Sequence, residues 1–207
     1  MRAIWERLAA FASKTPKSLR LRPGTSESSI RAAERTIGLP FPDDLRASLL
    51  LHDGQEPGDG DDEAFEWLPG HGRLARLDAI VAEWKDECAT YEKFHGAETP
   101  QEIDDGQLYH YLWHPKRIPL AGNPWWDQDN TYLDFLPGPN GVPGQVVMFG
   151  KGCFGEVHGP SLRAAMELYV RALESGEWLF RDGQCVPRAK RVSGWASYAR
   201  KKLAKPC

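Results

Sequence analysis

Apolar residues recur every three or four positions in five stretches of the chain, a spacing that predicts amphipathic helices. Serine or threonine is expected at the start of two of them, because its side chain caps free N–H groups, and glycine at the end. The last predicted helix, for example, begins after Ser161 and stops at Gly176. The other four cover residues 2–13, the stretch from a cap at Thr25 or Ser26 to Gly38, the stretch from Pro40 to Gly54, and residues 77–94 with Asp78 as cap.

Between the last two helices, short apolar runs alternate with dense turn chemistry. Three runs, at 118–121, 131–135 and 145–149, predict consecutive strands, and Asp134 interrupts the second. Residues 137–141 can only form a turn, because proline fixes φ and glycine supplies positive φ. Weaker strand patterns occur at 65–68, 108–113 and 156–158, and a loop is expected over 96–106. A sheet core without a catalytic signature points to a binding module.

Charge is distributed unevenly along the 207 residues, although the net charge is only −3. Residues 53–66 hold seven acids and no base, whereas residues 188–207 hold seven bases and no acid. We expect one domain over residues 1–180, with residues 1–18 as a helical extension, and a basic tail over 181–207. The tail could be solvated, could fold back as a terminal helix, or could bind nucleic acid through Trp195 and Tyr198.

Each candidate catalytic or metal-binding pattern in the sequence lacks a feature that its chemistry requires. Residues 150–155 match G-x-G-x-x-G, but the helix that should open inside a dinucleotide-binding motif begins only after Ser161. His110 and His114 suit a metal on a helix, but Pro115 and the neighbouring aromatics favour a strand, which separates them by about 13 Å. Cys153 lacks any visible activating group. We therefore expect no enzyme, no metal and no cofactor.

The sequence was searched for membrane spans, a signal peptide and cysteine motifs, which indicate the cellular compartment. No segment approaches 18 apolar residues, and Arg2, Glu6 and Arg7 interrupt the apolar N-terminus, so neither a membrane span nor a signal peptide is expected. The four cysteines match no Cys-x-x-Cys spacing. Free thiols in a reducing cytoplasm are expected, with one or two disulfides left open.

Two blocks of residues resemble the motifs of a known superfamily. The first contains Thr25–Ile30, Gly38-Leu39-Pro40 and Leu51–Gly54; the second contains Trp113–Lys116, Tyr132–Asp134 and Gly144–Val146. In order and spacing they resemble the SUKH superfamily, which includes a fungal cell-wall-assembly regulator and many bacterial immunity proteins. The resemblance spans Leu19 to Phe180. Three places depart from it: Arg117 stands where an aromatic is common, residues 123–126 replace a Gly/Asp-rich turn, and the tail has no counterpart.

The resemblance implies an α+β fold, with helices packed around a central, mostly antiparallel sheet, and a non-enzymatic protein-binding role. Our leading hypothesis is an immunity protein that binds and neutralises a cognate bacterial toxin, with a nucleic-acid-directed enzyme as one candidate; the alternative is a regulatory scaffold of the cell-wall-regulator type. No membrane or nucleic-acid partner is expected. Of the two adjacent tryptophans, one should pack on the domain and the other serve an interface. The expected partner contacts are Asp59, Asp61, Asp62, Glu63, Trp125, Trp126 and Asp127.

Overall fold

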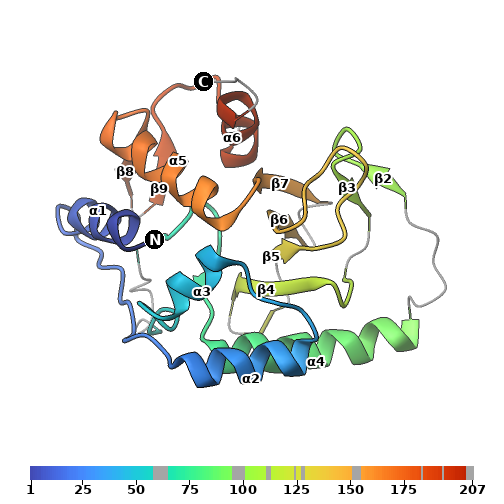
Figure 1. Ribbon diagram of the computed structural model, residues 1–207. Helices are drawn as coiled ribbons and strands as arrows, with labels where there is room; N and C mark the ends of the chain where they lie inside the picture. Colours follow the sequence, from blue (N-terminus) through green and yellow to red (C-terminus); the bar gives the residue numbers. More distant parts are fainter. Residues whose placement is uncertain are drawn as a thin grey trace.

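The computed structural model describes residues 1–57, 65–94, 101–110, 113–123, 125–126, 129–150, 155–182, 184–192 and 194–203. The fold is α+β, as the resemblance implied, with helices around a central antiparallel sheet (Figure 1). The helices are α1 (Arg2–Ala12), α2 (Glu27–Ile37), α3 (Asp43–Leu49), α4 (Leu77–Phe94), α5 (Leu162–Glu174) and α6 (Trp195–Leu203).

The central sheet has five strands in the order β1-β4-β5-β6-β7, and every neighbouring pair is antiparallel. The three consecutive strands predicted from the sequence are confirmed. At the middle of the sheet, Tyr132 of β5 lies between Pro119 of β4 and Val147 of β6. The strands are β1 (Arg73–Leu74), β4 (Arg117–Gly122), β5 (Asn130–Asp134), β6 (Gln145–Phe149) and β7 (Glu156–Gly159).

Two small hairpins complete the strands, β2 (Glu102–Ile103) with β3 (Leu108–Tyr109), and β8 (Trp178–Arg181) with β9 (Gln184–Pro187). The first hairpin corrects the sequence prediction, because β2 lies inside the expected loop and β3 is much shorter than 108–113. The strand predicted at 65–68 was wrong. Phe65 is fully buried, but its carbonyl accepts a hydrogen bond from the Gln55 side chain (3.0 Å) instead of pairing in a sheet.

Helix ends follow the expected capping chemistry in two cases. The Ser26 hydroxyl accepts a hydrogen bond from the Ser29 N–H (3.1 Å), and the Ser161 hydroxyl accepts one from the Ala164 N–H (3.1 Å). The prediction for α4 was wrong in one detail. Asp78 lies inside the first turn, and the carboxylate of Asp53 accepts the Leu77 N–H (2.7 Å). The helix after Pro42 is also shorter than predicted, ending at Leu49.

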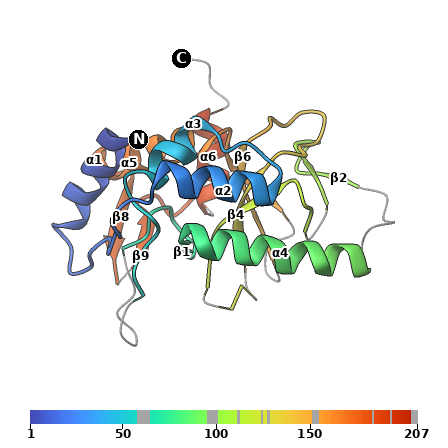
Figure 2. The same cartoon turned by 60° about the horizontal axis from the view of Figure 1, so that its bottom comes forward.

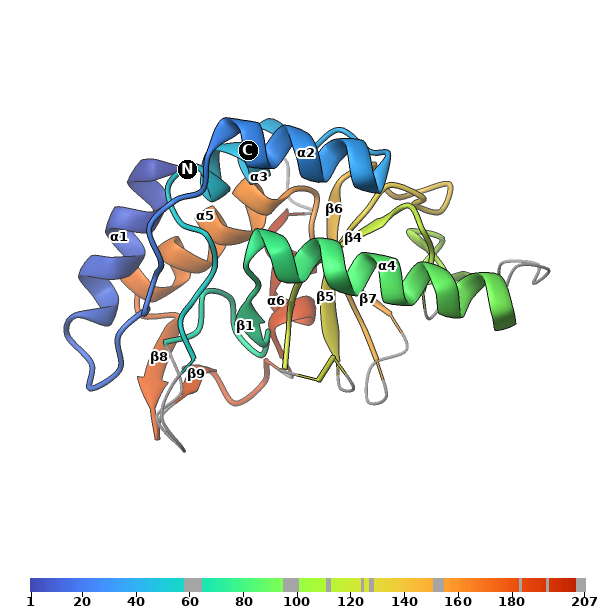
Figure 3. The same cartoon turned by 90° about the horizontal axis from the view of Figure 1, so that it is seen from below.

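Both faces of the sheet are covered. The larger core joins Ile118, Leu120 and Leu133 to apolar side chains of α1, α2, α3 and α5. A smaller core on the other face contains Tyr132 and Val147, packed against side chains from α4. Helices α2 and α4 run side by side next to β4, whereas α1 and α5 lie together at the other end of the molecule (Figures 2 and 3).

The basic C-terminal segment is folded onto the body. Trp195 of α6 is only 4% exposed, and its ring centroid lies 5.3 Å from that of Trp178 in β8 and 5.6 Å from that of Tyr169 in α5. Lys202 forms an ion pair with Glu177 (2.8 Å). Of the three interpretations offered by the sequence, the structure therefore has the terminal helix packed on the domain. The boundary expected after residue 180 falls inside β8.

Candidate protein-interaction site

The loop between β4 and β5 presents a tryptophan to solvent. Trp125 is 78% exposed, the largest exposure among the exposed large hydrophobic residues of the described chain. Its neighbour Trp126 is half-buried. The adjacent tryptophans therefore have different environments, and one side chain packs on the domain while the other projects from it.

Trp126 is held in an unfavourable backbone conformation by its neighbours. Its φ of +52° lies in the left-handed region, which a bulky side chain rarely occupies. The Asn130 side-chain amide donates a hydrogen bond to the Trp126 carbonyl (2.8 Å), and the Trp126 N–H donates to the Asn123 carbonyl (3.2 Å). A β-carbon at Gly122 would lie only 2.7 Å from the Trp126 ring. Trp126 is thus fixed by specific contacts that together outweigh the local strain.

The other five expected contacts lie outside the described residues: Asp59, Asp61, Asp62, Glu63 and Asp127.

The described acids of the acidic run serve the fold itself. Asp53 caps α4, Glu56 pairs with Arg22, and Glu66 accepts hydrogen bonds from the N–H groups of Cys185 (2.8 Å) and Gly70 (3.1 Å). Burial raises the pKa of Glu66, and these backbone hydrogen bonds oppose the shift.

A buried polar network joins three strands of the central sheet. Arg117 and Asp134 form an ion pair (3.3 Å) with neither side chain exposed, and the Arg117 guanidinium lies 4.0 Å from the centroid of the Phe149 ring. Gln145 donates to Asp134 (3.2 Å) and to the Gln107 carbonyl (3.0 Å). The network therefore ties β4, β5 and β6 to the turn after β2, and explains why a strand contains Asp134.

A second buried chain of polar groups joins Thr131, His71 and His158. The Nε2 atom of His71 lies 2.8 Å from Nδ1 of His158, while Nδ1 of His71 bonds the Thr131 hydroxyl. The Nε2 atom of His158 lies 3.6 Å from the Glu156 carboxylate. Such an order of groups could move protons, but the Thr131 side chain is completely buried, so its hydroxyl is not presented to a substrate. This hydrogen-bonded series of side chains was not predicted from the sequence, because the two histidines are 87 residues apart.

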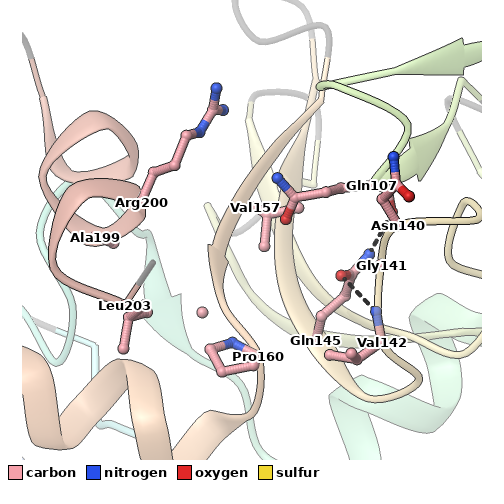
Figure 4. A pocket seen from close by; sticks show the side chains of 11 residues that line it. Gln107, Asn140, Gly141, Val142, Gln145, Val157, Pro160, Ala199, Arg200 and Leu203 are labelled. Atoms are coloured by element: carbon pink, nitrogen blue, oxygen red, sulfur yellow. Dashed lines mark hydrogen bonds between the residues drawn. The ribbon is translucent and has the colours of Figure 1, made fainter. Parts of the chain in front are cut away.

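A cleft opens between α6 and the loop after β5 (Figure 4). Its volume is about 220 Å³. Val142 on one wall and Leu203 on the other are 44% and 38% exposed. This cleft was not predicted from the sequence, because Leu203 belongs to the segment expected as a tail.

Two kinds of site are missing from the part of the chain that the structure describes. Nowhere in these ranges do three His, Cys, Asp or Glu side chains converge as metal ligands would. None of the described helices combines the length and apolar character needed to cross a bilayer.

Comparison with known proteins gives a consistent set of relatives. The chain is 24% identical to the glucan synthesis regulatory protein of Neurospora crassa, over 84% of this chain and 38% of that protein. It is 26% identical to the cell wall biosynthesis/cell cycle regulator smi1 of Schizosaccharomyces pombe (84% and 36%) and 26% identical to the cell wall assembly regulator SMI1 of Saccharomyces cerevisiae (82% and 41%). The chain thus spans about two fifths of the length of these relatives.

The family comparison covers most of the fold. Residues 24–180, from the segment before α2 to β8, match the model of the SMI1/KNR4 family, also called SUKH-1. The match includes the whole central sheet with Arg117, Asp134 and Gln145, and leaves out α1, β9 and α6. This chain belongs to the SMI1/KNR4 family (SUKH-1).

Proposed function

We propose that this chain is a regulatory protein-binding module and that Trp125 lies at the centre of its partner surface. The observation that carries the proposal is the 78% exposure of Trp125 beside Trp126, whose strained backbone is held by hydrogen bonds with Asn123 and Asn130. Tryptophan is enriched at interface hot spots, and a side chain next to a fixed backbone position loses less entropy when it binds. Backbone strain maintained by surrounding contacts is typical of functional positions.

The relatives support a regulatory role over the immunity role that led our sequence-based hypotheses. All three relatives are named as regulators, of glucan synthesis, cell-wall biosynthesis or cell-wall assembly. Because the chain spans only about two fifths of their length, the regulated process is itself part of the proposal for this chain. A non-enzymatic role fits the burial of the hydrogen-bonded side chains of Thr131, His71 and His158, because buried groups are not presented to a substrate.

The proposal can be tested by affinity capture with quantitative mass spectrometry. The tagged full chain and its Trp125→Ala variant would be expressed in cells of the organism that encodes the protein. Their complexes would be crosslinked before capture. We expect a reproducible set of partners whose recovery falls at least about tenfold in the variant, as for loss of a hot spot worth about 1.4 kcal/mol or more. Leu50→Ala, at a 43% exposed leucine elsewhere, is the matched control and should retain them. Equal recovery with Trp125→Ala would refute the role of Trp125.

An immunity protein that neutralises a toxin is the second candidate. It is motivated by the resemblance to bacterial immunity proteins and by the acidic run at residues 53–66, since an acidic inhibitor would attract a basic nucleic-acid enzyme. Asp59, Asp61, Asp62, Glu63 and Asp127 would then join Trp125 at the interface. Co-expression with the product of the neighbouring gene tests this hypothesis. If the hypothesis is right, that product is toxic and co-expression of this chain abolishes the toxicity. If the product is harmless, or remains toxic in the presence of this chain, the regulatory function is favoured.

A further inference from the structure

We propose that a basic surface, formed by the segment after β9 and the last turn of α6, binds an acidic segment of a partner protein. Five side chains make up this basic surface: Arg188, Lys190, Arg191, Lys201 and Lys202. The inference rests on the proposed protein-binding function and specifies the charge of a partner. It uses none of the residues of the loop between β4 and β5.

Glu177 brings the two parts of the basic surface together. Its carbonyl accepts the Arg188 N–H (2.8 Å), so the segment after β9 begins beside it. Its carboxylate pairs with Lys202 of α6 (2.8 Å) and accepts the Tyr198 hydroxyl (3.1 Å). The segment that begins at Arg188 and the last turn of α6 therefore flank one residue, on the side of the molecule away from α2 and α4 (Figure 1).

Both parts of the basic surface are fixed to the body of the protein. The Val192 N–H donates to the Ala189 carbonyl (3.1 Å), so Lys190 and Arg191 occupy the two central positions of a turn. Both are exposed, whereas Val192 packs against the larger core. Trp195, which is 4% exposed, anchors the start of α6. The backbone under the bases is thus ordered before a partner arrives, which lowers the entropic cost of binding.

Most of the positive charge on the basic surface is not neutralised. Four of the five bases, all except Lys202, are exposed and make no ion pair within the residues that the structure describes. Arg200 of the same helix is not counted among them, because Asp104 and Asp105 offset its charge. The basic surface is therefore a local excess of positive charge on a chain whose net charge is −3.

The helix dipole accounts for only part of this pattern. Bases in the last turn of a helix are stabilised by the partial negative charge of its C-terminus, which explains Lys201 and Lys202. Lys190 and Arg191 lie outside α6, so the dipole does not explain them. Like charges held close together repel one another, and carboxylates of a partner would relieve that repulsion and attract the partner during its approach.

An acidic protein segment fits the basic surface better than nucleic acid does. The aromatic rings next to the bases, Trp195 and Tyr198, are 4% and 7% exposed, so they offer no face on which a nucleobase can stack. Glu177 lies among the bases, where it would repel a continuous phosphate backbone. A peptide, in contrast, can place its carboxylates opposite the bases alone.

The basic surface lies outside the part of the chain that matches the family. That match ends at residue 180, before all five bases. A partner bound here would be selected by residues that the family match does not include, so this chain could differ from its relatives in the partner it accepts.

A fluorophore-labelled acidic dodecapeptide, with Glu and Asp separated by Ser and Gly, tests the proposal in a polarisation titration of the full chain. We expect binding that weakens as the salt concentration rises. Binding to the double variant Lys190→Glu/Arg191→Glu should be at least about tenfold weaker, because two attractive charges become repulsive. Arg35→Glu/Lys85→Glu, at exposed bases of α2 and α4, makes the same change in net charge and is the matched control. It should bind as the wild type does, and a peptide with Gln and Asn in place of Glu and Asp should not bind.

Carbodiimide coupling locates the peptide on the wild-type chain without any substitution. The reagent joins a lysine amine to a carboxylate in contact with it as an amide, and mass spectrometry then identifies the lysine. We expect coupling of the acidic peptide to Lys190, Lys201 and Lys202, and little coupling to Lys85.

Several outcomes would overturn the basic surface. These are the absence of peptide binding at low salt, equal weakening in the two double variants when thermal melting shows both to be folded, or coupling spread evenly over Lys85 and the lysines of the surface. Tighter binding of duplex DNA or of phosphatidylserine vesicles than of the peptide, lost in Lys190→Glu/Arg191→Glu, would assign the surface to another class of partner and overturn the proposal as well. Loss of partners with Trp125→Ala, together with failure of the peptide test, would remove the basic surface and leave the proposed function intact.

Discussion

The guanidinium of Arg117 and the carboxylate of Asp134 lie 3.3 Å apart with neither side chain exposed to solvent. Arg117 stands where the resemblance led us to expect an aromatic, and its guanidinium stacks on Phe149 (4.0 Å) as a planar group would. It also donates to the Tyr109 carbonyl (3.0 Å) of β3. Arg117 thus connects the central sheet to the small hairpin of β2 and β3.

Removing one member of this pair should be strongly destabilising. In Asp134→Ala, Arg117 keeps its charge in a dry environment without its counter-ion, which typically costs about 3–5 kcal/mol. Urea unfolding of the wild type and the variant would measure the difference. Asp78→Ala breaks the exposed Arg76–Asp78 pair and serves as the control, with an expected loss below about 1 kcal/mol. If both variants lose the same free energy of unfolding, the buried pair contributes no more to stability than the exposed pair.

A methyl group at Gly122 should disturb the Trp125 loop. The β-carbon of Gly122→Ala would lie 2.4 Å from the Asn130 side-chain oxygen and 2.7 Å from the Trp126 ring, so both must move, at a cost of about 1–3 kcal/mol. We expect a changed near-UV circular dichroism spectrum and weaker partner capture. Gly194→Ala is the matched control, since nothing lies within 4 Å of its β-carbon. A spectrum identical to the wild type would show that Gly122 does not hold Trp126.

Local signals in the sequence identified the elements that depend on local chemistry. Ser26 and Ser161 marked helix starts, and alternating apolar runs with Pro-Gly turns marked β4, β5 and β6. Features that depend on distant contacts were not visible. Phe65 lies in an apolar run that resembles a strand, but it bonds to Gln55 instead of a strand partner.

The same limit applies to the candidate site. The exposure of one tryptophan and the packing of the other follow from Gly122 and Asn130, which flank the loop in the folded chain. The cleft requires Leu203 to approach Val142, and that approach depends on Trp195 packing and on the Arg200–Asp104 pair. Sequence spacing contains no information about either contact.

Acidification should destabilise the fold through buried histidines. Burial, followed by the charge of facing His158, holds the pKa of His71 well below 6.5, so folded His71 stays neutral while the unfolded side chain takes up a proton. Stability is therefore fully present above pH 6.5 and falls as the pH drops below it, by up to about 1.4 kcal/mol per pH unit. Burial also lowers the pKa of His114 to about 4, which extends the loss toward that pH.

His71→Gln isolates the contribution of one histidine to this pH dependence. Glutamine can still bond Thr131 but takes up no proton, so the stability of the variant should fall less steeply between pH 6.5 and 5. His158, which faces His71, and Glu156, 3.6 Å from His158, stay in place. Urea unfolding at several pH values measures the slope independently of any constant loss of stability. Parallel curves for wild type and variant would contradict the assignment to His71.

Two tryptophan substitutions should separate stability from binding. Trp195 is 4% exposed and packs against Trp178 and Tyr169, so Trp195→Ala leaves a large cavity and should cost about 3–5 kcal/mol. Trp125 is 78% exposed, and Trp125→Ala should change stability by no more than about 0.5 kcal/mol while it removes partners. Urea unfolding measures the free energy of unfolding of both variants, and the substitution is Trp→Ala in each. If Trp195→Ala leaves the midpoint unchanged, α6 does not contribute to the core, and a cleft that uses α6 as its wall would lose its structural basis.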